Sequence, residues 1–281
     1  MYTGYIEAND ITDQEWADIC SNKLDGLRGE LQLLENQYLI VTDSEGKLTS
    51  VFVKQDNIFH EVFYPVYETL NAGTIKPRNK EQYCAMDMMM DERSPVKLVS
   101  GTHGAGKDFI MLNAALSQVQ DGKYDKLLYI RNNIDVANTT SLGALPGEKS
   151  DKMKPWLAAL TDHVGGWEGL NMLITRGKIE SEHLGYLRGR DIKNTIIYVT
   201  EAENLTKEHV QLLLGRVGEG SALWMNGDYR QTDRAVFKKN SGMKHAVKAL
   251  KGNPLFAYMN MPVSERSSVA ALADELDKVE L

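Results

Sequence analysis

The sequence predicts an α/β fold in which a mostly parallel sheet carries a phosphate-binding loop at one edge. Three observations lead to this prediction. The chain of 281 residues is 42% hydrophobic and 25% charged, which is typical of a globular protein with a sizeable core. Short apolar runs of strand length recur from residue 96 onward. The first run leads into a glycine-rich loop and then into a helical pattern over residues 109–116.

Five apolar runs are expected to form the strands of this sheet. They are residues 96–100, 126–130, 195–199, 222–225 and 256–259. Each run is followed by glycine or a polar residue, as expected where strands deliver functional groups to one edge of a sheet. Between the second and third runs, residues 137–180 contain several glycines and suggest a mobile insertion near the nucleotide.

The amino-terminal part of the chain has a different pattern and is expected to be a small α+β domain. A capping box at Thr12–Glu15 predicts a short helix. Residues 37–42 and 48–53 flank a polar turn and predict a β-hairpin, which residues 58–62 can extend. We therefore expect two domains, one at residues 1–72 and the other at 73–281.

The loop after the first strand carries the chemistry. It consists of Gly101, Thr102, His103, Gly104, Ala105, Gly106, Lys107 and Asp108. Its glycines let backbone N–H groups turn inward around phosphate, the following helix adds the partial charge of its N-terminus, and the lysine reaches the terminal phosphates. The loop departs from the GxxxxGK[ST] pattern at one position, because Asp108 stands where Ser or Thr is expected.

A second departure mirrors the first. The apolar strand at 195–199 runs into Thr200, where phosphate-loop enzymes have an Asp that helps to hold Mg²⁺. Carboxylate and hydroxyl have thus exchanged places between Asp108 and Thr200. One interpretation is a transposed metal site formed by these two residues, since magnesium requires oxygen ligands from any segment. The alternative is a decayed site in which Asp108 repels phosphate.

Glu201 follows Thr200 and is a candidate catalytic residue. A carboxylate beside the metal can orient or deprotonate an attacking water. The alternative is a solvated Glu that merely opens the loop before a helix.

Several segments in a fixed order resemble the ATPase domain of PhoH-like proteins, which are similar to the core of superfamily-1 helicases. They span about residues 75–278, and their joint order is more specific than any one motif. The matching segments are 75–82, the phosphate loop, Arg131, 145–156, 186–190, 201–206, 227–231 and 265–267. The departures at Asp108, Thr200 and Glu203 fall on metal or γ-phosphate chemistry.

This resemblance implies a RecA-like fold that binds ATP with Mg²⁺, and it suggests roles for further residues. Gln82 belongs to a motif that looks like an adenine-side element, and Gln231 would sense the γ-phosphate. Arg266 and Arg216 are candidates for stabilising the charge that develops on phosphoryl oxygens. Either arginine can act in its own chain or on a neighbour, because the family suggests rings, including hexamers.

Composition limits the partners of the chain. A net charge of −7 argues against a strongly basic nucleic-acid clamp but permits a local groove. Arg188 and Arg190, which flank a glycine in a matched motif, are the favoured candidates for binding single-stranded RNA or DNA. A second basic cluster lies at residues 238–248.

Localisation is expected to be cytoplasmic. Two distant cysteines suit a reducing compartment, the first residues do not form a secretory signal, and no apolar run can span a membrane. The sequence therefore predicts a Mg-dependent ATP-binding protein, expected to be an ATPase that acts on single-stranded RNA or DNA in a helicase-like manner. The alternative is a non-hydrolysing, nucleotide-gated binding module with a degenerate catalytic site.

Overall fold

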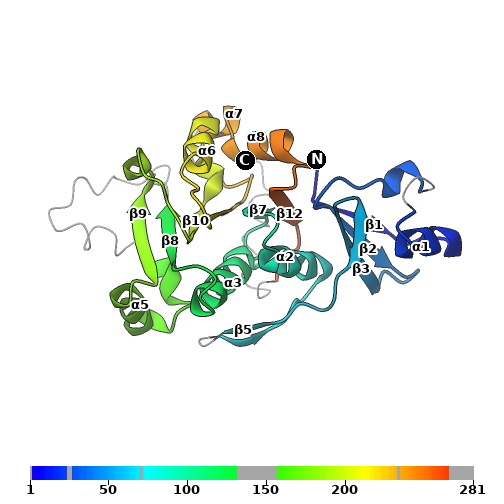
Figure 1. Cartoon of the computed structure of the whole chain (residues 1–281), viewed down its shortest axis with the longest axis horizontal. Helices are drawn as coiled ribbons and strands as arrows, with labels where there is room; N and C mark the ends of the chain where they lie inside the picture. Colours follow the sequence, from blue (N-terminus) through cyan, green and yellow to red (C-terminus); the bar gives the residue numbers. More distant parts are fainter. Residues whose placement is uncertain (1, 24–26, 70–71, 132–156, 233–234, 266–281) are drawn as a thin grey trace, which may run out of the picture.

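The computed structural model describes residues 2–23, 27–69, 72–131, 157–232 and 235–265. Two sheets dominate it. In Figure 1 the small N-terminal sheet (blue) lies at one end of the molecule, and the strands of the larger sheet extend toward the other end.

The larger sheet contains six parallel strands in the order β12-β7-β11-β10-β8-β9. The strands are β7 (Val96–Gly101), β8 (Lys126–Arg131), β9 (Ile179–His183), β10 (Thr195–Thr200), β11 (Ala222–Gly227) and β12 (Phe256–Met261). This arrangement confirms the predicted fold class, a RecA-like P-loop domain beside a smaller N-terminal sheet. Because all six strands are parallel, their carboxyl ends meet at one edge, where ligands bind in such folds.

Helices cover both faces of this sheet, so the strands are buried on both sides. On one face lie α2 (Lys80–Met90) and α3 (Lys107–Gln120), whose side chains share a core with alternate residues of β7, β8, β10, β11 and β12. The other face packs against α6 (Lys207–Leu214), α8 (Gly242–Leu250) and the short 3-10 helices η3 (Leu184–Leu187) and η4 (Ala202–Asn204). The helix α7 (Ala235–Lys239) precedes α8.

The predicted hairpin of the N-terminal sheet forms, with one strand added ahead of it. It contains β1 (Tyr5–Ala8), β2 (Tyr38–Thr42), β3 (Leu48–Gln55) and β4 (Ile58–Glu61). The capping box at Thr12 opens α1 (Asp13–Cys20), and η2 (Gly29–Leu31) follows. One face of the sheet packs on α1, and its other face joins the core around α2.

Specific polar contacts attach this small sheet to the larger one. The Tyr38 hydroxyl donates to a carboxylate oxygen of Asp87 on α2 at 2.7 Å. The Asn36 side chain donates to the carbonyls of Asn253, Pro254 and Phe256 at 2.9–3.3 Å, just before and at the start of β12. A short hairpin of β5 (Tyr67–Thr69) and β6 (Gly73–Ile75) then leads into α2. The boundary at residue 72 stays a prediction.

The interpretation of residues 137–180 as a mobile insertion is wrong for the part that the structure describes. Residues 157–161 are helical, and they are followed by α5 (Gly166–Thr175) and by β9, the edge strand of the main sheet. Leu160, Val164 and Leu170 are fully buried. The glycines misled the interpretation because Gly165 and Gly166, with φ of +79° and +77°, form the turn that opens α5, and Gly169 lies inside that helix. The rest of this stretch lies outside the described residues.

The structure also bears on the expectations about membrane spans and cysteines. Among the described residues, no helix is long and apolar enough to cross a membrane. Both cysteines are free thiols, of which Cys84 is buried and Cys20 is exposed.

A fully buried lysine, Lys97, lies on β7 beneath the carboxyl end of α2. Its ammonium group donates to the carbonyls of Met89 and Asp91 and lies 5.1 Å from the centre of the Trp224 ring. It thereby satisfies carbonyls that the end of a helix leaves unpaired. Burial lowers the pKa of Lys97 to about 8, although nearby carboxylates oppose this shift.

This lysine predicts a pH dependence of stability. Above pH 8 the folded state has lost the Lys97 proton, whereas the unfolded state keeps it up to about pH 10.4, so stability attributable to this residue rises with pH in that interval. The free energy of unfolding, measured by urea titration, should rise relative to the Lys97→Met variant by about 2–3 kcal/mol between roughly pH 8 and 10. Parallel pH profiles for the two proteins would contradict the assignment.

Candidate active site

The phosphate loop joins β7 to α3 at the carboxyl edge of the main sheet. Gly104 and Gly106 have φ of +80° and +85°, a region that glycine enters without steric cost. A Cβ atom at Gly101 would lie 2.2 Å from the Met261 carbonyl oxygen of the neighbouring strand, so this position also requires glycine. The sequence therefore builds the predicted loop in the predicted context.

Lys107 is folded over the loop that precedes it. Its Nζ atom donates to the carbonyls of Gly101 and Thr102, both at 2.9 Å. Burial lowers the pKa of Lys107, while the carboxylates of Asp228, Asp108 and Glu203 act in the opposite direction. A phosphate that enters the loop would therefore have to draw this ammonium group away from two carbonyls.

Gln82 braces the loop from the side of α2. Its amide nitrogen donates to the Ala105 carbonyl at 3.1 Å, and its amide oxygen accepts from the Arg78 backbone at 2.9 Å. Asn79 caps α2 and also donates to the Glu265 carboxylate at 2.6 Å. Gln82 thus contacts the loop in which the sequence placed the nucleotide, and its adenine-side role stays a prediction.

Asp108 and Thr200, the exchanged pair, lie side by side. The Thr200 hydroxyl donates to Oδ1 of Asp108 at 3.3 Å. The same oxygen accepts from the Tyr198 hydroxyl at 2.7 Å and from the Asn226 amide at 2.9 Å. Three donors from two strands therefore converge on one carboxylate oxygen in the first turn of α3.

Tyr198 and Asn226 were missed in the sequence. Tyr198 precedes Thr200 by two positions, which places both side chains on the same face of β10. Asn226 lies near the end of β11, the strand between β7 and β10, and its amide also donates to the Tyr198 hydroxyl at 2.6 Å. Asn226 could have been found in the sequence, because it is a polar residue near the end of an otherwise apolar strand. Nothing local distinguished Tyr198 from a core tyrosine.

Glu201 is held by an ion pair with Arg131. The guanidinium group of Arg131, at the end of β8, donates from Nε to one carboxylate oxygen at 2.9 Å and from an Nη atom to the other oxygen. Glu201 also adopts φ of +53°, which is uncommon for a residue with a side chain. Both oxygens of the candidate base are thus engaged, and the backbone that carries them is in a less favourable conformation.

Glu203 stands where the resembled family has Gln, and it lies against the end of β11. Its carboxylate accepts from the Asp228 backbone N–H at 3.0 Å and is almost fully buried. Burial raises the pKa of Glu203 to about 7. A Cβ atom at Gly227 would come within 2.3 Å of this carboxylate, so the Gly227-Asp228 step is shaped around it.

The remaining candidate catalytic residues, Gln231, Arg216 and Arg266, do not gather around the phosphate loop in the described part of the chain. Gln231 is exposed beyond β11, and its backbone N–H donates to the Asp228 carbonyl at 3.1 Å. Arg216 lies at the opposite, amino edge of the sheet, where it donates to the Arg190 carbonyl at 3.2 Å. It is therefore remote from the phosphate loop of its own chain. Arg266 lies outside the described residues.

The two arginines proposed for nucleic acid differ in their surroundings. Arg188 is exposed beyond η3. Arg190 lies 3.7 Å from carboxylate oxygens of both Glu180 and Glu182 on β9. Arg190 is thus partly neutralised within the chain, and Arg188 is the more accessible of the pair.

Comparison with known proteins agrees with this architecture. A family model described as "PhoH-like protein" matches residues 74–271. The chain is 33% identical over 252 residues to "Protein PhoH2" of Bacillus subtilis (strain 168), which covers 86% of this chain and 56% of that protein. It is 31% identical over 205 residues to "Protein PhoH2" of Mycolicibacterium smegmatis, covering 72% and 47% respectively.

A "PhoH-like protein" of Bacillus subtilis is 29% identical over 238 residues, covering 81% of this chain and 72% of that protein. The chain spans about half the length of the two PhoH2 relatives. The match includes the phosphate loop and the carboxyl ends of β10 and β11, which are the segments that build the site described above. On these grounds the chain belongs to the PhoH-like family.

Proposed function

We propose that this protein binds ATP with Mg²⁺ and hydrolyses it, using a metal site in which carboxylate and hydroxyl have exchanged positions. The observation that carries the proposal is the 3.3 Å contact between Thr200 and Asp108. Two unrelated losses would not be expected to restore one carboxylate and one hydroxyl at the same place. The family membership supports a nucleotide-binding, ATPase-like protein.

The donor set fits magnesium, which prefers oxygen ligands. Among the described residues, the hydrogen bonds to Asp108 all end on Oδ1, so Oδ2 is the oxygen that can meet a cation. The Thr200 hydroxyl lies beside it, and the side-chain amide oxygen of Asn226 lies 3.5 Å from that hydroxyl. Bound there with nucleotide, the ion would neutralise charge on the phosphate oxygens. Asp108 and Thr200 are the residues that would hold it.

The chain's own residues have distinct tasks in this proposal. The loop N–H groups and Lys107 bind the phosphates, and Glu201 orients or deprotonates the attacking water. Gln231, beyond the end of β11, contacts the γ-phosphate region. Arg266, or Arg216 of a neighbouring copy, stabilises developing charge. A ring of subunits would supply that neighbour.

We further propose that single-stranded RNA, or DNA, is the ligand on which this ATPase acts, and that the protein works in the cytoplasm. The exposed guanidinium of Arg188 supports the first point, since single strands are bound through their phosphates. The free thiols support a reducing compartment.

One observation favours the alternative, a nucleotide-gated binding module that does not hydrolyse ATP. Arg131 occupies both oxygens of Glu201. A carboxylate with both oxygens on a guanidinium has only its remaining lone pairs for water, so we expect proton transfer to be slow until the pair opens. The two functions separate in an assay of ATP turnover with and without RNA, in which binding without turnover identifies the module.

Glu201→Gln should abolish turnover while leaving nucleotide binding intact. The amide cannot accept the proton, so the turnover rate should fall by a factor of about 10²–10⁴. Binding of a fluorescent ATP analogue should change little, because the substitution alters no loop N–H group or lysine. Turnover equal to that of the wild type would exclude Glu201 as the base.

Exchanging the two residues tests the metal site. Asp108→Thr removes the carboxylate to which Tyr198 and Asn226 donate, and Thr200→Asp places a second carboxylate against the first. Each single change should weaken Mg·ATP binding at least about tenfold, roughly the 1–3 kcal/mol of an unsatisfied buried group. The double change restores one carboxylate and one hydroxyl and should recover most of the affinity, measured by calorimetry. A double variant as weak as the singles would contradict the exchange.

Arg131→Ala should raise basal turnover about two- to fivefold, because it releases Glu201 at the loss of a half-exposed ion pair worth roughly 0.5–1 kcal/mol. The KM for ATP should stay constant. Lys123→Ala, which removes the surface pair with Glu92, provides the control and should leave turnover unchanged. A fall in turnover to the level of Glu201→Gln would show instead that Arg131 positions the base.

A further inference from the structure

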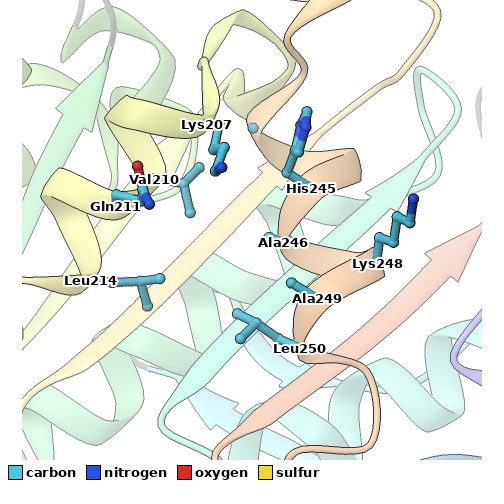
Figure 2. A pocket seen from close by; sticks show the side chains of 10 residues that line it. Lys207, Val210, Gln211, Leu214, His245, Ala246, Lys248, Ala249 and Leu250 are labelled. Atoms are coloured by element: carbon cyan, nitrogen blue, oxygen red, sulfur yellow. The ribbon is translucent and has the colours of Figure 1, made fainter.

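An apolar groove separates α6 from α8 on the face of the main sheet opposite α2 and α3 (Figure 2). It has a volume of about 560 Å³. Its floor and walls are apolar and come from both helices: Val210 and Leu214 from α6, with Ala246, Ala249 and Leu250 from α8. We call it the α6–α8 groove. It lies on a different face from the nucleotide site, so it is not part of the chemistry described above.

Positive charge borders this groove on both sides. Lys207 is the first residue of α6 and lies at one rim, and Lys248 lies on the exposed side of α8 at the other. His245 lies between the two lysines, at the end of the groove where both helices begin. The nearest acidic residue on α6, Glu208, accepts from Asn240 at 2.8 Å and is thus directed toward the segment before α8. The groove therefore suits an apolar stripe with acidic residues beside it.

The chain itself contains a segment with that pattern in residues 269–281. Val269, Leu272, Leu276 and Val279 recur at intervals of three and four residues, which predicts one apolar stripe along a helix. At about 100° per residue, Glu275 falls on one side of this stripe and Glu280 on the other. The apolar and charged positions therefore match those of the groove.

The described part of the chain ends at the correct edge for this segment to reach the groove. The Glu265 backbone donates to the Gly104 carbonyl at 3.0 Å, so residue 265 lies at the carboxyl edge of the sheet beside β7. Both α6 and α8 begin at the same edge, joined by the contact of the Gly242 N–H with the Leu205 carbonyl at 2.8 Å. The strands β11 and β10 lie one and two places from β7.

The lengths are also compatible. Residues 266–268 span about 10 Å when extended, roughly two strand spacings. A helix over residues 269–279 would be about 16 Å long, against about 13 Å for α8. The segment is thus long enough to run along the whole groove.

We propose that residues 269–281 bind the α6–α8 groove of their own chain as an amphipathic helix. Leu272 and Leu276 fill the apolar floor, and Glu275 and Glu280 face the lysines at the rims. Because the segment is tethered, its effective concentration at the groove is on the order of millimolar. The proposal does not depend on ATP hydrolysis.

Hydrogen exchange of the full-length chain, followed by mass spectrometry, tests the binding. Amides of residues 269–279 should exchange at least about tenfold more slowly in the wild type than in Leu272→Asp/Leu276→Asp. The control, Ala270→Asp/Ala271→Asp, adds the same charge away from the apolar stripe and should resemble the wild type. Equal and fast exchange of the segment in all three proteins would overturn the proposal.

A charge exchange tests the orientation of the segment in the groove. Lys207→Glu/Lys248→Glu should accelerate exchange of residues 269–279, and adding Glu275→Lys/Glu280→Lys should restore the slow rate. Restoration identifies the rim lysines as the partners of the two glutamates. Failure of the fourfold variant to recover protection would exclude this charge pairing.

A disulfide test decides whether the groove and segment belong to one chain. In a Cys20→Ser background, Ala249→Cys and Leu276→Cys should form a disulfide within one molecule on mild oxidation, detected as a monomer that has lost two alkylatable thiols until it is reduced. Cross-linked dimers that form in place of this closed monomer would show that a second copy occupies the groove and would overturn the proposal.

Discussion

The carboxylate of Asp108 is the point at which the site is joined together. It connects the first turn of α3 to β10 through Tyr198 and Thr200, and to β11 through Asn226. Buried polar groups must be paired, and leaving one unpaired costs about 1–3 kcal/mol. Three such groups donate to this single oxygen. The strand order makes this possible, because β11 and β10 are the next two strands on one side of β7, so both of their carboxyl ends reach the helix that follows the phosphate loop.

This constraint gives the residue exchange a physical logic. A carboxylate in the first turn of a helix is stabilised by the helix N-terminus, and it requires donors on the strand that faces it. A threonine at position 200 supplies such a donor, whereas an aspartate there would place like charges in contact. Given Asp108, the hydroxyl at Thr200 is thus the compatible partner. The pair is coupled, and neither residue can be understood by itself.

The other charged groups of the site are paired within the chain. Lys107 lies on the carbonyls of its own loop, Arg131 holds Glu201, and the Glu203 carboxylate accepts from the backbone of Asp228. A ligand must therefore replace contacts that already exist, and its net affinity is the difference between new and old interactions. Nucleotide binding that draws Lys107 toward phosphate also changes the field around Asp228 and Glu203, which surround this lysine.

The sequence by itself determined the parallel strands, the phosphate loop, the capping box of α1 and the hairpin of the N-terminal sheet. These features depend on local periodicity and turn chemistry, which neighbouring residues encode. It also paired Asp108 with Thr200, since a motif fixes both positions. Only the tertiary structure revealed Tyr198, Asn226 and Arg131 as their partners, because strand order decides which strand ends meet. Only the tertiary structure likewise revealed β9, because the glycines in the stretch before it suggested a mobile insertion. It also placed Arg216 at the amino edge of the sheet, which follows from the direction of the strands.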